Sequence, residues 1–208
     1  MNLRPYRSAV RAENAERTRS RIVKAAAGML ARAERFSLDA VAKKARVTRL
    51  TVYHQFGSRR ALLEAVFDDM AVRGGLHRIR DAMANPDPDA ALQQIVVIFC
   101  DFWRGAPATL WRIHAASASD PEFEESLRVR NERRRRLLSV LIERMAEGKD
   151  IPAKVTSDLV DTVFALTSLS FYSELAVRGR SADAVCQLIQ GLVVDVVWRA
   201  RVRPSRPA

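Results

Sequence analysis

Residues 37–59 of the chain read SLDAVAKKARVTRLTVYHQFGSR, and this stretch decides the fold. Ser37 stands where the N-cap of a helix belongs, and the apolar residues at positions 38, 41, 42 and 45 follow the spacing of one helix face. Thr48 stands at a second N-cap position, and Val52, Tyr53 and Phe56 carry the next apolar face. The stretch therefore predicts two short helices, over about 38–45 and from Thr48 to Phe56, with a short turn between them.

The residues before this stretch predict a longer helix. From about Glu16, apolar residues recur over four turns with helical spacing, at Ile22, Ala26, Met29, Leu30 and Ala33. Two short helices packed on a longer one are the layout of a helix-turn-helix, whose last helix enters the major groove of DNA. We expect a shared core of Ile22, Ala26, Leu30, Phe36, Leu38, Val41, Val47, Val52 and Phe56. Residues 1–16 show little apolar periodicity and predict a flexible basic arm, either inserted in a minor groove or simply disordered.

Residues 37–59, with Ala-Leu-Leu following at 61–63, closely resemble the N-terminal signature of the tetracycline-repressor (TetR) family. The match covers roughly residues 17–67. The resemblance implies an all-α chain of three parts: the arm (1–16), a helix-turn-helix domain (17–61) and a helical ligand-binding and dimerisation domain (62–208). It also implies a homodimer that binds a palindromic double-stranded DNA operator and responds to a small-molecule effector.

The resemblance further assigns residues to the DNA contact. Side chains that would touch phosphates are Arg17 (or Arg19), Ser37, Thr48, Tyr53, His54 and Arg59. Side chains directed at base edges would be Arg49, Leu50 and Thr51. Arg46 stands where the family usually has glycine; a positive φ there would cost roughly 1 kcal/mol, which a phosphate contact could offset. Tyr53 has an alternative role as a core aromatic residue.

Charge distribution agrees with a DNA-binding head. Residues 1–60 hold 15 Lys and Arg against 4 Asp and Glu, whereas residues 61–208 hold 20 of each sign, so the whole net charge of +11 is N-terminal. A cationic segment beside a neutral body suits a polyanion-binding module joined to a separate domain.

Composition excludes several classes of protein. With 48% hydrophobic residues and only 8 Gly and 8 Pro, the chain suits a helical globular protein. The longest apolar run, 95–100, is too short for a membrane span, and no signal peptide is recognisable. Two cysteines without metal-ligand spacing favour the reducing cytoplasm, and no metal or cofactor is expected.

The rest of the sequence predicts about six further helices, about nine in all. The first runs from Arg59 to about Met83, with either a bend or an end at Gly74-Gly75. The others span about 88–103, 107–116, 121–145, 156–178 and 181–201. In the family the fourth helix links the DNA module to the ligand-binding body, so its movement would change the separation of the two recognition helices.

The last two predicted helices are apolar over more than one face, which suggests an interface between two subunits. The residues expected there are Leu159, Val163, Leu188, Leu192 and Val196. The alternative is that both faces are buried within one chain.

Aromatic and polar side chains of the middle helices are candidates for an effector pocket. They are Phe99, Trp103, Trp111, His114, Asn131, Arg134, Phe164 and Phe171. Arg134 would either meet an anionic group of the effector or pair with a carboxylate such as Asp101 or Asp161. The aromatic residues are equally compatible with an ordinary core.

These observations predict a transcriptional regulator, more specifically a repressor that a small molecule releases from its operator. No catalytic triad, phosphate-binding loop or paired catalytic carboxylates can be found, so an enzyme is not expected. The alternative is an architectural or membrane-surface protein that uses its basic segment without sequence preference.

Overall fold

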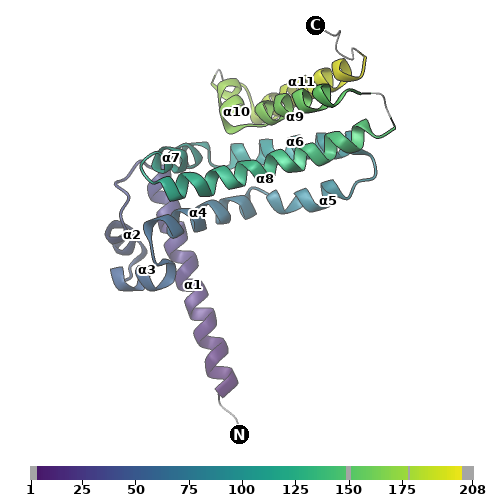
Figure 1. Ribbon diagram of the computed structural model, residues 1–208. Coiled ribbons are helices and arrows are strands. Elements are labelled where there is room, and N and C mark those ends of the chain that lie inside the picture. The colour runs from purple at the N-terminus through teal and green to yellow at the C-terminus, as the bar shows by residue number, and fades with distance from the viewer. Residues whose placement is uncertain (1–3, 149–150, 178, 203–208) are drawn as a thin grey trace. The chain divides into compact units, whose positions relative to one another are not determined.

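The structure is a computed structural model that describes residues 4–148, 151–177 and 179–202 (Figure 1). Every regular element in these ranges is helical, with eleven α-helices and one 3-10 helix, η1, so the prediction of an all-α fold is confirmed. About nine helices were expected. The difference arises because two of the predicted long helices are each divided.

The chain divides into two compact units. The first comprises residues 1–69 and 108–124, and the second comprises residues 70–107 and 125–208. Helices α4 (Arg59–Arg73) and α8 (Pro121–Ala146) each contribute residues to both units. The functional division of the chain at residue 61 stays a prediction.

The first unit contains α1 (Arg4–Ala31), α2 (Leu38–Ala45), α3 (Arg49–Phe56), the first part of α4 and most of α7 (Pro107–Ser117). The predicted shared core forms: Ile22, Ala26, Leu30, Val41, Val52 and Phe56 are all buried. Phe36, Leu38 and Val47 are half-buried at its edge. Leu62, Leu63 and Val66 of α4 are fully buried as well, which explains how helices of two turns stay folded.

Helix α1 begins much earlier than the sequence predicted. It starts at Arg4, so residues 4–16 are helical rather than an irregular arm, and residues 1–3 of the predicted arm lie outside the described residues. Apolar periodicity could not reveal this extension, because residues 11–17 are all exposed. Alanine, arginine and glutamate nevertheless favour a helix on their own, and Glu13 pairs with Arg17 one turn on at 3.6 Å.

The second unit contains η1 (Leu76–Arg78), α5 (Ile79–Met83), α6 (Pro88–Gly105), α9 (Ala153–Leu166), α10 (Leu169–Ala176), α11 (Ala182–Val202) and most of α8. Helix α6 begins as predicted, with the Asp87 side chain accepting from the backbone N–H of Asp89 at 2.9 Å and with Pro88 in the first turn. Helix α6 packs against α5 and α11, and α11 packs against α9 (Figure 1). The apolar face of α6 forms the centre of this core.

The glycine pair after α4 ends that helix. Gly75 has a left-handed backbone (φ 79°), which stops the helix and leads into η1. A Cβ atom on Gly74 would lie 2.6 Å from Cδ2 of Phe102 and 3.1 Å from its Cα. Gly74 therefore lets the end of α4 approach α6 more closely than any other residue would.

The predicted helix 156–178 is two helices, α9 and α10, with a break at Thr167 and Ser168. Thr167 Oγ1 donates to the carbonyl of Val163 at 2.8 Å, and Ser168 Oγ accepts from the N–H of Phe171 at 3.1 Å as the N-cap of α10. The freed carbonyl of Thr167 accepts from Trp103 Nε1 at 2.9 Å. Local hydrogen bonding by Thr and Ser thus overrides a continuous apolar pattern.

Candidate nucleic-acid interface

Two side-chain caps set the geometry of the helix-turn-helix, as the sequence predicted. Ser37 Oγ accepts from the N–H of Ala40 at 3.2 Å, and Thr48 Oγ1 accepts from the N–H of Thr51 at 3.1 Å. Each cap satisfies a backbone donor that the first turn of a helix leaves free. The bounds of α2 and α3 consequently agree with the predicted ones.

The turn between α2 and α3 requires a left-handed residue, and that residue is Arg46. Its φ is 53° and its ψ 48°, and its N–H donates to the carbonyl of Lys43 at 3.2 Å. The guanidinium is exposed. The expected backbone cost of about 1 kcal/mol at this position therefore applies, and the side chain is free to reach a phosphate.

Helix α3 presents a sharply divided surface. Val52 and Phe56 are buried, whereas Arg49 and His54 are exposed and Thr51 is half-buried. The side chain of Leu50 is 62% exposed and that of Tyr53 56% exposed, so the alternative role of Tyr53 as a core residue is wrong. An exposed leucine and tyrosine beside an arginine form a surface that suits base edges, including a thymine methyl group, and phosphates.

Arg49, the first residue of α3, already has an anionic neighbour. Its Nη1 lies 3.4 Å from Oδ2 of Asp39 in α2, and both side chains are more than half exposed. A pair this exposed contributes little to stability. The pair places Asp39 beside the guanidinium at the N-terminal end of α3, a contact that the sequence pattern did not reveal.

The other cations near the helix-turn-helix divide into available and structural ones. Arg17 pairs with Glu13, and both side chains are more than half exposed, so the Arg17 guanidinium lies at the surface. Arg19 is structural, because it donates to the carbonyl of Gln55 at 3.1 Å and stacks 4.5 Å from the ring centre of Phe56. Arg59, at the start of α4, lies 5.6 Å from the ring centre of Phe36. Of the two alternatives for the first helix, Arg17 is the better candidate.

Glu34 joins the end of α1 to α2. Lys44 Nζ contacts Glu34 Oε2 at 2.6 Å, and Arg32 Nε donates to Glu34 Oε1 at 2.8 Å. Hydrogen bonds from Lys44 and then Arg32 lower the pKa of the Glu34 carboxyl below its ordinary value. One carboxylate between two cations therefore fixes α2 relative to α1.

The predicted effector residues do not form one cluster. Phe99, Trp103, Arg134 and Phe164 come together in the second unit, whereas Trp111 and His114 belong to the first. Trp111 and Asn131 are exposed, so the candidates do not share one buried pocket; Phe171 is half-buried on α10. Four cavities among the described residues are lined by side chains other than these candidates.

Arg134 is buried and has no carboxylate partner among the described residues. Only 9% of the residue is exposed, and its Nη1 donates to the carbonyl of Thr167 at 2.7 Å. The guanidinium lies 3.9 Å from the ring centre of Phe164, and its Nε has no hydrogen-bond partner. The alternative of an ion pair is wrong, since Asp161 pairs with Arg135 and Asp101 with Arg78 and Arg104. Burial lowers the pKa of Arg134 to about 10.

The predicted interface residues divide into buried and accessible ones. Val163 is fully buried within the single chain and Leu159 is nearly so, because the apolar face of α9 packs against α11. Leu188 is exposed, and Leu192 and Val196 are half-buried. Helix α11 exposes three more apolar side chains that were not in the predicted set: Val194, Trp198 and Val202. An interface on this face would therefore use α11 and not the buried side of α9.

No group of three or more His, Cys, Asp or Glu side chains among the described residues could hold a metal ion. No helix of the described ranges is long and apolar enough to cross a membrane.

Residues 22–66, which include the C-terminal part of α1, all of α2 and α3 and the start of α4, match the family model described as bacterial regulatory proteins of the tetR family. No curated protein sequence matches the chain significantly.

The chain is similar in fold to solved regulators. One is a transcriptional regulator of the TetR/AcrR family from Thermobifida fusca (TM-score 0.64, 22% identity, 85% of this chain and 96% of that chain). A TetR-like regulator from a Rhodococcus species has a TM-score of 0.59 at 21% identity (88% and 94%). A putative TetR-family regulator from Mesorhizobium loti has a TM-score of 0.62 at 15% identity (88% and 96%).

At these identities the likeness of the whole chain concerns the fold. The segment that carries the caps, the left-handed turn and the exposed face of α3 is the part that the family model covers. A family of DNA-binding regulators also agrees with the expectation that the chain is not an enzyme. Residues 22–66 therefore carry the DNA-binding domain of the tetR family of bacterial regulatory proteins, within a chain whose fold is similar to that of solved TetR regulators.

Proposed function

We propose that the protein is a homodimeric, sequence-specific repressor that leaves its operator when a small-molecule effector binds. The single observation that carries the proposal is the exposed face of α3, where Arg49, Leu50 and Tyr53 project from a helix whose other face is buried. A protein gains nothing for folding from exposing a leucine and a tyrosine on one short helix, whereas a major groove would cover both.

Base recognition would come from the first turn of α3. Arg49 is the side chain that reads the O6 and N7 atoms of guanine with two hydrogen bonds, and Leu50 is suited to a thymine methyl group. Thr51 is half-buried and its hydroxyl lies 2.8 Å from that of Thr48, so we expect it to have the smaller share in specificity.

Phosphate contacts would surround this reading surface. Arg17, Arg46, Tyr53, His54 and Arg59 offer cationic or hydrogen-bonding groups, and the capping hydroxyl of Ser37 keeps a proton to donate. The Thr48 hydroxyl can donate to a phosphate when Thr51 is the donor of the hydrogen bond between the two threonines. All except Arg17 lie on or beside α2 and α3, in the segment with the whole excess charge of the chain. The charge would supply affinity, and the hydrogen bonds would fix the register.

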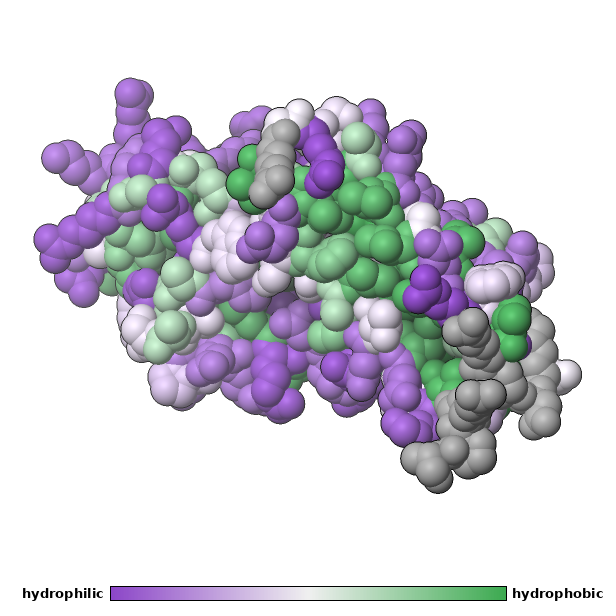
Figure 2. Space-filling model, turned by 90° about the horizontal axis from the view of Figure 1, so that it is seen from above, coloured by the Kyte–Doolittle hydropathy of each residue, from purple (hydrophilic) through white to green (hydrophobic). Residues whose placement is uncertain are grey.

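Helix α11 supplies the surface for dimerisation. Leu188, Val194, Trp198 and Val202 are exposed on one side of it, and Figure 2, seen from the side of α9–α11, shows hydrophobic side chains gathered along this face. Two copies of such a face would form an isologous interface. A helix-turn-helix protein needs that symmetry, because two recognition helices must reach half-sites roughly 34–36 Å apart on a palindromic operator.

Effector release needs only a modest coupling between two sites. A coupling free energy of about 1–3 kcal/mol changes operator affinity some 5- to 150-fold, and it acts equally in both directions. Helix α4 begins at Arg59, directly after α3 and its cap, and ends at Arg73 in the second unit, so one helix joins the reading surface to that unit. A repressor that acts on bacterial chromosomal DNA works in the cytoplasm, so we expect the protein there.

Selection of bound fragments from a pool of random duplexes, with the full chain at physiological salt, tests the proposal. We expect one enriched palindrome whose half-site centres lie one helical turn apart. Enrichment of no sequence, with equal competition from unrelated DNA and anionic vesicles, would favour a non-specific anionic-surface protein instead.

A further inference from the structure

A cavity of about 480 Å³ lies in the second unit, beside the residues where α4 and α6 end. Its charged lining consists of Arg73, Arg78, Arg104 and Asp101. Met70 and Phe102 add apolar surface. The volume lies within the range of small-molecule sites, and the lining carries three guanidinium groups against one carboxylate.

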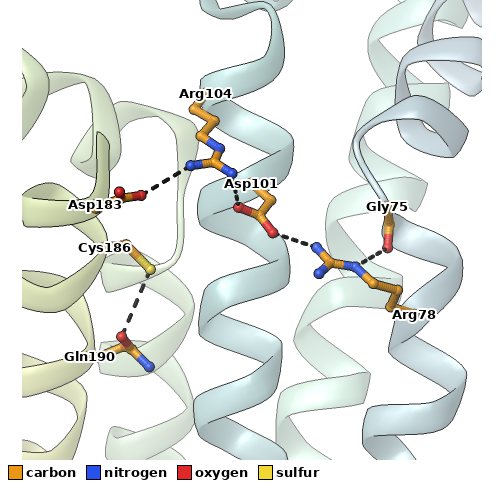
Figure 3. Close-up of polar contacts among 7 residues, drawn as sticks. All are labelled: Gly75, Arg78, Asp101, Arg104, Asp183, Cys186 and Gln190. Carbon is orange, nitrogen blue, oxygen red and sulfur yellow. Dashed lines mark hydrogen bonds and ion pairs between the residues drawn. The ribbon is translucent and has the colours of Figure 1, made fainter. Parts of the chain in front are cut away.

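Asp101 holds two of these guanidinium groups in place (Figure 3). Arg78 Nη2 donates to Asp101 Oδ2 at 2.6 Å, and Arg104 Nη2 lies 3.0 Å from Asp101 Oδ1. Each oxygen of the carboxylate therefore has its own arginine. Arg104 also contacts Asp183 at 3.1 Å, but the side chain of Asp183 is 84% exposed, so water screens that pair strongly.

The backbone makes room for this arrangement. Arg78 Nε donates to the carbonyl of Gly75 at 3.3 Å, and a Cβ atom on Gly75 would lie 2.8 Å from that same Nε. Gly75 thus allows the guanidinium to fold back under its own turn. Gly105 also lines the cavity, and a Cβ atom on it would meet nothing within 4 Å.

We propose that this cavity binds a small organic oxyanion, a carboxylate or a phosphate on a compact apolar body, and that this anion is the effector. The inference deepens the proposed function and rests on it. Guanidinium groups bind such anions with paired, charge-assisted hydrogen bonds. Because Asp101 orients Arg78 and Arg104 beforehand, binding needs little reordering of the side chains. Met70 and Phe102 would contact the apolar body.

The position of the cavity suits an effector. Met70 and Arg73 line the cavity and belong to the last turn of α4, the helix that follows α3. An anion bound in the cavity would therefore contact that turn. The site is distinct from Arg134, whose guanidinium is packed between the rings of Phe99 and Phe164.

Isothermal titration of the full chain with benzoate, phenyl phosphate and neutral benzamide tests the binding site. We expect saturable binding of one or both anions and none of benzamide, since only the anions complement the guanidinium groups. Binding of benzoate but not phenyl phosphate, or the reverse, identifies the oxyanion. Failure of both anions to bind would overturn the proposal.

Three variants separate this site from general charge effects. R104Q removes one donor and should weaken binding about tenfold. G105L places a bulky side chain at a lining residue and should abolish binding, so the test survives a folding defect in R104Q. R80Q is the matched control, since Arg80 is a nearby arginine outside the lining whose side chain is 94% exposed. Equal binding by R104Q, G105L and R80Q would overturn the proposal.

Operator affinity, measured with and without the bound probe, keeps the two proposals apart. A chain that selects an operator but binds neither anion refutes the site and leaves the proposed DNA-binding function intact. A probe that binds with the expected variant pattern and lowers operator affinity supports both. A probe that binds and leaves operator affinity unchanged overturns the effector role of the site.

Discussion

The guanidinium of Arg49 lies 3.4 Å from the carboxylate of Asp39, so the first residue of the recognition helix is paired across the turn with a residue of α2. An anion at this position repels phosphates and competes with a base for the same arginine. The D39N variant should therefore bind every duplex more tightly, whatever its sequence. Fluorescence anisotropy with the operator and an unrelated duplex would measure both affinities, and a gain for the operator alone would contradict this explanation.

Replacing Arg49 and replacing Arg59 should have different effects on DNA binding. R49A should relax the preference at one base pair of each half-site, costing about 1–3 kcal/mol of discrimination. R59A should weaken all duplexes alike and make the dependence of affinity on salt shallower. Titrations of operator and mismatched duplexes at several salt concentrations distinguish the two. Wild-type binding by both variants would refute the residue assignment.

The left-handed backbone of Arg46 has a measurable cost. R46G should raise the free energy of unfolding by up to about 1 kcal/mol, because glycine accepts a φ of 53° without strain. It should also weaken DNA binding through the lost guanidinium. Chemical denaturation gives the first quantity and anisotropy the second, and a destabilised R46G would show that the arginine side chain stabilises the turn.

Arg134 is a buried cation that packing and hydrogen bonds must compensate. R134M keeps most of the side-chain volume and leaves the Thr167 carbonyl bound to Trp103. We therefore expect its free energy of unfolding to lie within about 1 kcal/mol of that of wild type. R134A leaves a cavity beside Phe164 and should cost about 2–5 kcal/mol. Urea denaturation of both variants measures the contrast. Equal losses would mean that the charge, and not the packing, is essential.

The exposed face of α11 should determine the oligomeric state. W198D introduces a charge where 61% of a tryptophan is exposed and should give monomers at micromolar concentration, with loss of operator binding. V177D is the matched control, because Val177 is 72% exposed after α10 and lies off this face. Sedimentation velocity of both variants is the measurement. A wild-type monomer, or a dimeric W198D, would disprove the interface.

Much of the helix-turn-helix formed by α1–α3 could be predicted from the sequence, because the residues that determine its helices lie close together in the chain. The caps at Ser37 and Thr48 fix both short helices, and the helical spacing of Ile22 and Val52 reveals the core that they share. The resemblance of one continuous stretch to a known signature completed the prediction. No long-range information was needed there.

The second unit could be predicted only in part, because its features depend on contacts between distant residues. The carbonyl freed at the Thr167 break is bound by Trp103 and Arg134, which lie 64 and 33 residues away in the sequence. Side-chain exposure separated Val163 from Leu188 although both belong to apolar helices. The pairing of Asp101 with Arg78, 23 residues away, is likewise invisible to periodicity.

The close approach of Gly74 to Phe102 has a practical consequence for anyone adapting this protein as a biosensor. A library that diversifies the cavity should leave position 74 fixed, since every other amino acid would push the end of α4 away from α6. Position 105 is the better place to introduce variety, because a side chain there enters empty space. Of the two glycines that line this cavity, Gly74 must therefore be kept, whereas Gly105 can be replaced.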